Sequence, residues 1–319
     1  MHEFQIIKKY FSTLSKNNKS SLDLNDDVFF DKSKKLVVSI DTYVQGVHFI
    51  NFKKPELVIK KILRSSISDL ICKGVKPKYY FFSGSGNKKF FSKQNLKKIS
   101  KSLSEEQKKY KISLCGGDTV FSNKLSFSIT SIGFSTSIIY RNNSKLNDDI
   151  FVTGNLGDSF AGLKILTKRI TTNNKLKKYF EKKYYLPDLN LNFTKKLSIL
   201  ANTSIDISDG LITDLEKLVN KQKLSYKLNL DNIPTSINLK KLITSKKLRK
   251  ISFISRGDDY NILFTASPSK LRIINKTAKS LGIKISKIGK ICSKNQKSEI
   301  IDQKGKKIDV KDKGYFHQF

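Results

Sequence analysis

The sequence contains little cysteine, and it has no apolar run of the length that a membrane helix needs. Cys72, Cys115 and Cys292 are far apart and odd in number, so they indicate neither a disulfide framework nor a zinc site. No apolar run approaches the roughly 20 residues that span a bilayer. The first residues, MHEFQIIKKYF, are a candidate amphipathic helix, and no signal-peptide cleavage region follows them. We therefore expect a cytoplasmic protein.

Two common catalytic patterns are also absent. The sequence has no GxxxxGKS or GxxxxGKT segment, which argues against a P-loop kinase. It has three histidines, and none belongs to a recognisable Ser/His/Asp or Cys/His arrangement for nucleophilic catalysis. We therefore expect neither of these two catalytic arrangements in this protein.

Negative charge is scarce, since 62 Lys and Arg residues oppose 27 Asp and Glu residues and give a formal net charge of +35. A nucleic-acid-binding patch usually concentrates its cations on one face and uses Arg for bidentate contacts. Here Lys is spread almost evenly and Arg is scarce, which favours compositional drift over a binding patch. The charge would steer anionic substrates. A basic nucleic-acid-binding protein stays open as an alternative.

Strand-like and helix-like segments alternate along the chain, which predicts the α/β or α+β class. Apolar residues bounded by turn residues predict strands at 36–40 and 46–50. Pro55 begins a predicted helix that extends to about residue 70, and a later helix is predicted after Pro187. The polar segment 141–148 is a candidate hinge. We therefore expect two domains, residues 1–140 and 141–319.

The main functional signal is a series of short acidic motifs beside Gly, Ser and apolar segments. Any one Asp in such a motif is more often a turn former or a helix N-cap. Their repetition instead favours a site for a hard cation, because Mg²⁺ binds through carboxylates, waters and substrate phosphates. These motifs contain nine of the 27 acidic residues: Asp26, Asp27, Asp41, Asp69, Asp118, Asp206, Asp209, Asp258 and Asp259.

Three further features have both a functional and a structural interpretation. Residues 116–119, GGDT, combine glycines that let backbone approach a phosphate with a metal-ligand type. The glycines of residues 154–162 resemble a nucleotide-binding turn, but they equally fit a structural strand-to-helix turn. His48 follows Asp41 by seven residues, so it is a candidate ligand as well as a structural polar residue.

Several short motifs follow one another along the chain: NDD, SIDTYVQGVHF, SISDLICKGV, SLCGGDT, TGNLGDSFAGL, DISDGL, RGDDYNILF and KGY. Taken in order, they resemble the motifs of the thiamine-monophosphate kinase family. The resemblance extends from about Phe4 to Tyr315, and several motifs are shared with the superfamily of aminoimidazole ribonucleotide and selenophosphate synthetases. A related ATP-dependent synthetase with another small substrate is therefore the alternative enzyme hypothesis.

The resemblance implies a PurM-like fold with an N-terminal mixed-sheet domain for dimerisation and ATP binding, and a C-terminal α/β domain that completes the active site. It also implies a homodimer that transfers a phosphoryl group from ATP to thiamine monophosphate with several Mg²⁺ ions, without a general base. No specific nucleic acid and no membrane are implied as partners.

The family's site residues match positions in this sequence. The positions that match metal ligands are Asp27, Ser39, Asp41, Asp69, Asp118, Asp206 and Asp209. The positions that match nucleotide contacts are Gly117, Asp118, Arg141 and Ser208. The positions that match substrate contacts are His48, Asp258 and Tyr315.

Some positions depart from the family pattern. Asn25 stands where Gly is usual, and Ile40 stands where Thr is common. Arg256-Gly257-Asp258-Asp259 replaces Gly-Gly-Glu-Asp, and Asn261 replaces Glu. Asp258 is one methylene shorter than Glu, which raises the question of how it reaches the substrate.

Overall fold

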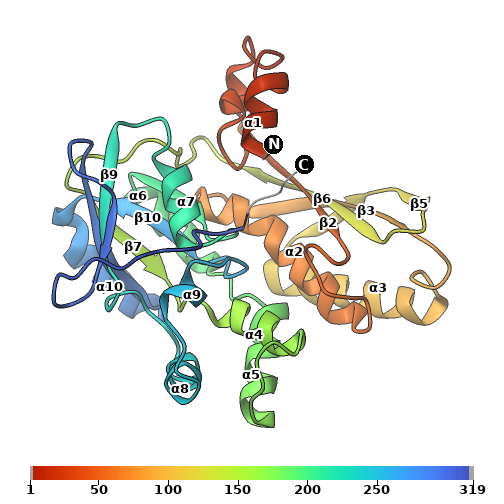
Figure 1. Cartoon of the computed structure of the whole chain (residues 1–319). Helices are drawn as coiled ribbons and strands as arrows, with labels where there is room; N and C mark the ends of the chain where they lie inside the picture. Colours follow the sequence, from red (N-terminus) through yellow and green to blue (C-terminus); the bar gives the residue numbers. More distant parts are fainter. Residues whose placement is uncertain (1–2, 316–319) are drawn as a thin grey trace.

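Helix α2, Pro55–Cys72, lies between two mixed sheets in the computed structural model, which describes residues 3–315 (Figure 1). It begins at a proline, whose fixed φ suits the first helical turn. The helix contacts strands β2 and β6 of the first sheet and strand β8 of the second. One helix can therefore present side chains to both halves of the molecule.

The first sheet has the strand order β1-β2-β6-β3-β4, and β5 pairs with the far end of β3. The β3–β4 and β3–β5 pairs are parallel, while the others are antiparallel. Helices α2 and α3 (Lys93–Tyr110) pack on one face of this sheet. The strands are β1 (Phe29–Asp31), β2 (Leu36–Val44), β3 (Pro77–Gly86), β4 (Ser113–Gly116), β5 (Thr119–Phe121) and β6 (Ser126–Phe134).

The second sheet has the order β12-β9-β11-β7-β10-β8. The β12–β9 pair is parallel and the other pairs are antiparallel. Its central strands β7 and β10 are buried along their whole length, as their continuous apolar runs require. The strands are β7 (Asp149–Thr153), β8 (Thr203–Asp206), β9 (Leu224–Asn229), β10 (Ile262–Ala266), β11 (Ile285–Ser293) and β12 (Glu299–Ile301).

The remaining helices surround the second sheet, apart from α1, which stands above the first sheet at the top of Figure 1. No helix within residues 3–315 is long and apolar enough to cross a membrane. These helices are α1 (Glu3–Ile6), α4 (Asp158–Leu166), α5 (Asn174–Tyr185), α6 (Thr194–Leu200), α7 (Leu211–Leu218), α8 (Ile237–Ser245), α9 (Ile251–Ile254) and α10 (Leu271–Leu281). Shorter turns are a π-helical turn at Ile7–Phe11 and 3-10 turns at Lys19–Leu24, Leu191–Phe193 and Pro268–Lys270.

The largest hydrophobic cluster joins the two halves. It contains buried residues of α2, such as Ile59 and Ile62, together with Phe151 and Phe264 of the second sheet. The rings of Phe151 and Phe264 stack with their centroids 5.2 Å apart. Because this apolar surface is removed from water by both halves together, it fixes how the two sheets face each other.

The predicted class is confirmed, since both sheets are mixed and each is covered by helices. The strand predicted at 46–50 is wrong. Gly46 has a φ of +85°, and its N–H donates to the Phe49 carbonyl 2.7 Å away, so the chain turns tightly there. Helix α5 was not predicted, because its Lys-rich sequence offers few apolar residues for periodicity to reveal.

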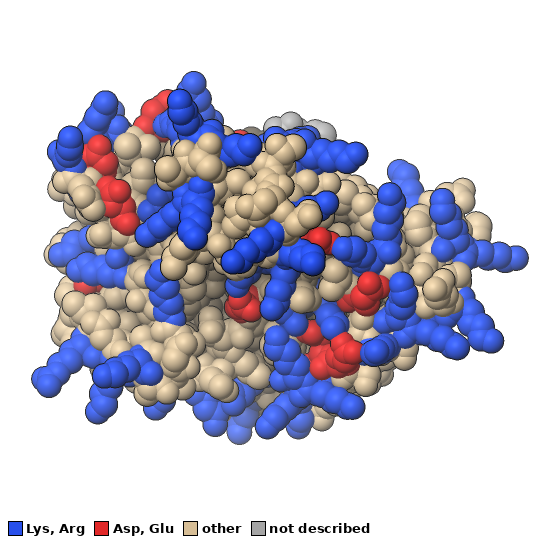
Figure 2. All heavy atoms as spheres, turned by 90° about the horizontal axis from the view of Figure 1, so that it is seen from below, with Lys and Arg blue, Asp and Glu red and all other residues tan. Residues whose placement is uncertain are grey.

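On the face seen in Figure 2, the cations do not gather in one place. Figure 2 shows Lys and Arg side chains over the whole visible face, with acidic side chains lying singly or in small groups among them. This distribution agrees with compositional drift better than with a nucleic-acid-binding patch.

Candidate functional site

A cavity of about 830 Å³ lies between the two halves. The N-terminal half contributes residues from β2, α2 and the loop before β1, and the C-terminal half contributes the loops that follow β8 and α9. Most of the predicted site residues line this cavity. They are Asp27, Asp41, His48, Asp69, Arg141, Ser208, Asp209, Asp206, Asp258 and Tyr315.

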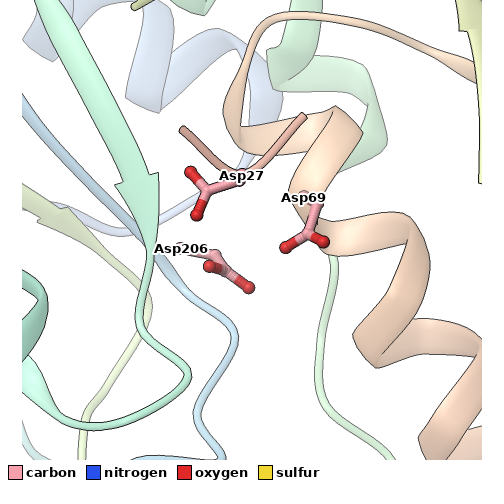
Figure 3. A group of neighbouring side chains, drawn as sticks. All are labelled: Asp27, Asp69 and Asp206. Atoms are coloured by element: carbon pink, nitrogen blue, oxygen red, sulfur yellow. The ribbon is translucent and has the colours of Figure 1, made fainter. Parts of the chain in front are cut away.

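Three carboxylates meet at one wall of the cavity. Asp27 comes from the loop before β1, Asp69 from the last turns of α2, and Asp206 from the end of β8. Each offers an oxygen, and these three oxygens lie within 4.8 Å of one another (Figure 3). Hard oxygen donors at this spacing suit Mg²⁺ or a similar divalent cation. The chain thus brings together carboxylates from three distant segments, whose mutual repulsion nearby cations would reduce.

Burial changes the protonation behaviour of these carboxyl groups. Burial raises the pKa of Asp41 to about 6, and it does the same for Asp206. The pKa of Asp69 is raised well above its ordinary value, first by burial and then by the charges of Asp41 and Asp206. Both causes disfavour the charged form. A bound cation would remove this penalty, so the electrostatics also favour a metal site.

Hydroxyl groups hold the carboxylates in place. The Tyr43 hydroxyl donates to Asp41 Oδ2 over 3.0 Å. The Ser39 hydroxyl donates to Asp69 Oδ2. Ser39 was predicted to bind metal, but it is buried and does not line the cavity. In this structure it supports a carboxylate.

Three basic side chains balance part of the negative charge. Arg141 forms an ion pair with Asp27, and Lys73 Nζ lies 2.7 Å from the other oxygen of Asp27. On the opposite side, Lys217 pairs with Asp209 and with the buried Asp214. Sequence reasoning did not identify Lys73 or Lys217. The signal that could have found Lys73 is its position four residues after Asp69, at the end of an apolar helix.

The predicted substrate contacts line the same cavity as the carboxylates. The Tyr315 N–H donates to the Asp209 carbonyl over 3.0 Å, and the Asp258 N–H donates to the Ser208 carbonyl over 2.8 Å. His48 Nδ1 accepts a hydrogen bond from the Val44 N–H over 3.0 Å. Asp258 has a φ of +67° and Tyr260 a φ of +51°, a conformation that non-glycine residues rarely adopt and that is often found at functional sites. Lys61, which sequence reasoning missed, lies 2.9 Å from Asp258 Oδ1.

Gly117 and Asp118 do not line the cavity of their own chain. They lie between β4 and β5 at the exposed edge of the first sheet. A Cβ at Gly117 would stand 1.8 Å from the carbonyl oxygen of Phe82, so glycine is required here by close approach to β3. The Asp118 N–H donates a hydrogen bond to the Ser83 hydroxyl oxygen over 3.1 Å.

The departures from the family pattern have local partners. The side chains of Asn25 and Asn220 exchange hydrogen bonds of 3.0 and 3.1 Å. Asn261 donates to the Asn155 carbonyl over 3.0 Å. Asp259 accepts the Gly157 N–H over 2.8 Å at the start of α4. The glycine-rich segment 154–162 is therefore bound to the chain's own Asp259, as the structural interpretation of that turn predicts.

The comparison with protein families matches residues 25–135 to the AIR synthase related protein N-terminal domain. Among curated proteins, the chain is 34% identical over 326 residues to the thiamine-monophosphate kinase of Buchnera aphidicola subsp. Schizaphis graminum, covering 99% of this chain and 98% of that protein. It is 27% identical to the thiamine-monophosphate kinase of Bacillus subtilis over 99% of both chains.

Solved structures share the fold. AaThiL complexed with AMPPCP and TMP aligns with a TM-score of 0.85 at 24% identity, covering 99% of this chain and 97% of that one. Thiamine Monophosphate Kinase from Aquifex aeolicus aligns with a TM-score of 0.78 at 25% identity, over 93% and 97% of the two chains. A chain of the HypE–HypF complex, at 14% identity, still gives a TM-score of 0.75. The two-sheet architecture is thus a PurM-like fold.

Proposed function

The chain belongs to the thiamine-monophosphate kinase family, and we infer that it catalyses the ATP-dependent phosphorylation of thiamine monophosphate to thiamine diphosphate. The structural observation that carries this inference is the convergence of Asp27, Asp69 and Asp206 in a cavity between the two halves. Related chains of this fold include one complexed with AMPPCP and TMP. A cavity that gathers carboxylates suits a reaction between two phosphate-bearing molecules that reach it with metal ions.

We propose that several Mg²⁺ ions bind the acidic end of the cavity. When bound, they would neutralise the phosphate charges that oppose the approach of two polyanions. Asp27, Asp41, Asp69 and Asp206 are placed to hold them, and Asp209 lies on the next loop. Ser39 would contribute by orienting Asp69.

The side chains of this site fit a reaction without a general base. The attacking phosphate oxygen of thiamine monophosphate is already ionised, so no proton has to be removed from it. His48 is the one histidine within the described residues, and its Nδ1 is occupied by a backbone N–H. The chain's contribution is instead to align the phosphates and to offset charge, for which Arg141 and Lys217 are suitably placed.

We assign the nucleotide to the acidic end, with Arg141 and Ser208 as contacts, and the thiamine ring system to the end with His48, Asp258 and Tyr315. All five line one continuous cavity, and Arg141 contacts one of the clustered carboxylates.

We propose that the protein is a homodimer and that the partner copy supplies Gly117 and Asp118. The face of the first sheet opposite α2 exposes apolar side chains, including Ile40, which is 70% exposed, and Phe134, which is 48% exposed. Ile40 also lines the cavity, so the cavity opens onto this face. A second copy packed there would cover the apolar surface and could bring its Asp118 to the acidic end.

The division into residues 1–140 and 141–319 remains our proposal for the two domains, with one sheet in each. A cytoplasmic location is also part of the proposal. The three cysteines are free, as is common where thiols are kept reduced.

The proposed activity is tested by offering purified protein ATP, Mg²⁺ and one acceptor at a time. We expect ADP formation with thiamine monophosphate and little with thiamine, because thiamine lacks the attacking phosphate. ADP formation that ignores the acceptor, or that requires another small molecule, would instead favour a related ATP-dependent synthetase.

A further inference from the structure

Helix α2 directs one face toward the cavity and the second half of the chain. Ser65 lies four residues after Lys61, and Ser68 and Asp69 lie three and four residues after Ser65, spacings that make these side chains neighbours on one side of a helix. Asp69 belongs to the carboxylate cluster, and Ser68 bonds to Asp206. Lys61 lies two turns earlier and reaches the substrate end of the cavity.

The surroundings of Lys61 are unusual for a lysine. Its side chain is 2% exposed, and its Nζ lies 4.1 Å from the centre of the Tyr184 ring. The same ammonium donates to the Tyr184 carbonyl over 3.1 Å. A buried ammonium is costly unless it is paired and hydrogen-bonded. Its one acidic partner within the described residues is Asp258, at 2.9 Å.

Within the described residues, both side-chain contacts of the Asp258 carboxylate involve the same oxygen. Lys61 Nζ lies 2.9 Å from Oδ1, and the Tyr260 hydroxyl donates to Oδ1 over 3.1 Å. Oδ2 is therefore the oxygen that is left for a ligand. Asp258 lines the cavity and its side chain is 25% exposed, so a ligand can reach it.

Resting on the proposed function, we propose that Lys61 is a positioning residue that sets the specificity for the thiamine ring system. It fixes Asp258 so that Oδ2 accepts a hydrogen bond from a ring N–H donor, such as the amino group of the pyrimidine. The shorter aspartate reaches the substrate because Lys61 and Tyr260 hold its other oxygen, and the left-handed backbone at Asp258 and Tyr260 brings both groups to Lys61.

The test compares Lys61→Met and Lys61→Arg with Lys60→Met as the matched control. Lys60 is the neighbouring lysine on α2, but it pairs with Glu105, and neither residue lines the cavity.

Loss of the buried charge partner of Asp258 predicts that Lys61→Met raises the KM for thiamine monophosphate about tenfold or more. The KM for ATP should stay within about twofold, because ground-state binding is lost at one end of the cavity alone. Lys61→Arg should recover part of the affinity, and Lys60→Met should behave as wild type.

A double-mutant cycle with Asp258→Asn separates positioning from general damage. If Lys61 acts through Asp258, adding Lys61→Met to Asp258→Asn changes the KM for thiamine monophosphate by less than about twofold. An undiminished effect in that background would overturn the proposal. So would an unchanged KM in Lys61→Met, or an equal rise in the KM for ATP, which a merely structural role predicts.

Calorimetric titration with thiamine monophosphate keeps this inference distinct from the proposed activity. If the wild type binds thiamine monophosphate without turning it over, the activity is wrong, and the same variants are then compared by dissociation constant. If the wild type neither binds nor converts it, both proposals fail.

Discussion

The hydroxyl of Ser68 lies 2.5 Å from Oδ2 of Asp206 and joins helix α2 to the end of strand β8. The same hydroxyl is 2.7 Å from the Ser65 carbonyl, but it has one hydrogen, and a carboxylate is the stronger acceptor. Both side chains are buried. This contact therefore links the N-terminal half directly to one member of the carboxylate cluster.

We expect Ser68→Ala to lower turnover and to raise the Mg²⁺ concentration needed for half-maximal activity, because Asp206 loses the group that orients it. The hydrogen bond to a buried carboxylate should also be worth about 1.5–3 kcal/mol of unfolding free energy. Denaturant unfolding and a Mg²⁺ titration of activity measure the two effects. Ser66→Ala is the control, since the Ser66 hydroxyl is buried but contacts Ser131 of the first sheet over 2.9 Å. Equal Mg²⁺ dependence in both variants would contradict the role of Ser68.

Asp206→Asn and Asp69→Asn should reduce turnover by orders of magnitude while the fold is retained. Each removes a charged oxygen that the proposed ions require, and each also relieves repulsion between buried carboxylates. Steady-state kinetics and circular dichroism measure both properties. The control is Asp148→Asn, because Asp148 is buried but bonds to Asn202 and Thr265 away from the cavity. Wild-type turnover in the two site variants would refute the metal assignment.

The raised pKa values predict how pH and Mg²⁺ act together on stability. Burial raises the pKa of Asp41 and of Asp206 to about 6 from the ordinary 3.8, so the folded state binds protons more tightly than the unfolded state. Their ionisation destabilises the metal-free protein above pH 6, and the penalty disappears as the pH falls from 6 toward 3.8.

Mg²⁺ should therefore stabilise the protein more at about pH 8 than at about pH 5, where protons compete for the same oxygens. Mg²⁺ at a hundred times its Kd adds about 2.7 kcal/mol to the free energy of unfolding. Thermal unfolding with and without Mg²⁺ at both pH values measures the difference, and Asp206→Asn should lose most of it. A rise in Tm that is the same at both pH values would count against the site.

The exposed position of Asp118 predicts complementation between two inactive variants. Asp41→Asn and Asp118→Asn should each be inactive alone. We propose that each active site takes Asp41 from one copy and Asp118 from the other. In a refolded equal mixture, about half of the dimers contain one copy of each variant, and each such dimer has one intact site. The mixture should therefore regain about a quarter of wild-type activity. Two variants of the cavity itself, Asp41→Asn and Asp69→Asn, should not complement. Absence of recovery in the first mixture, with dimers present by light scattering, would disprove a shared site.

Much of this architecture is visible in the sequence because local signals and the fold agree. Helix α2 begins at the predicted proline, and the acidic motifs other than that of Asp118 contribute residues to one cavity. The metal, nucleotide and substrate roles of these residues stay predictions until they are tested.

Other features depend on contacts that no local pattern contains. Lys61 looks like one more lysine among many, and its burial against Tyr184 depends on α5 packing beside α2. Ser39 was expected to bind metal, a role that stays a prediction, and the pleat of β2 turns its side chain inward to Asp69. Asp118 was grouped with the other acidic residues, although the strand pairing places it at an exposed edge.

The central claim is tested most directly by incubating the protein with thiamine monophosphate, Mg²⁺ and ATP labelled at the γ-phosphate, and then separating the thiamine phosphates. The account predicts labelled thiamine diphosphate from the wild type, in an amount equal to the ADP formed, and almost none from Asp206→Asn or without Mg²⁺. ATP consumption without label in thiamine diphosphate, or undiminished labelling by Asp206→Asn, would contradict it.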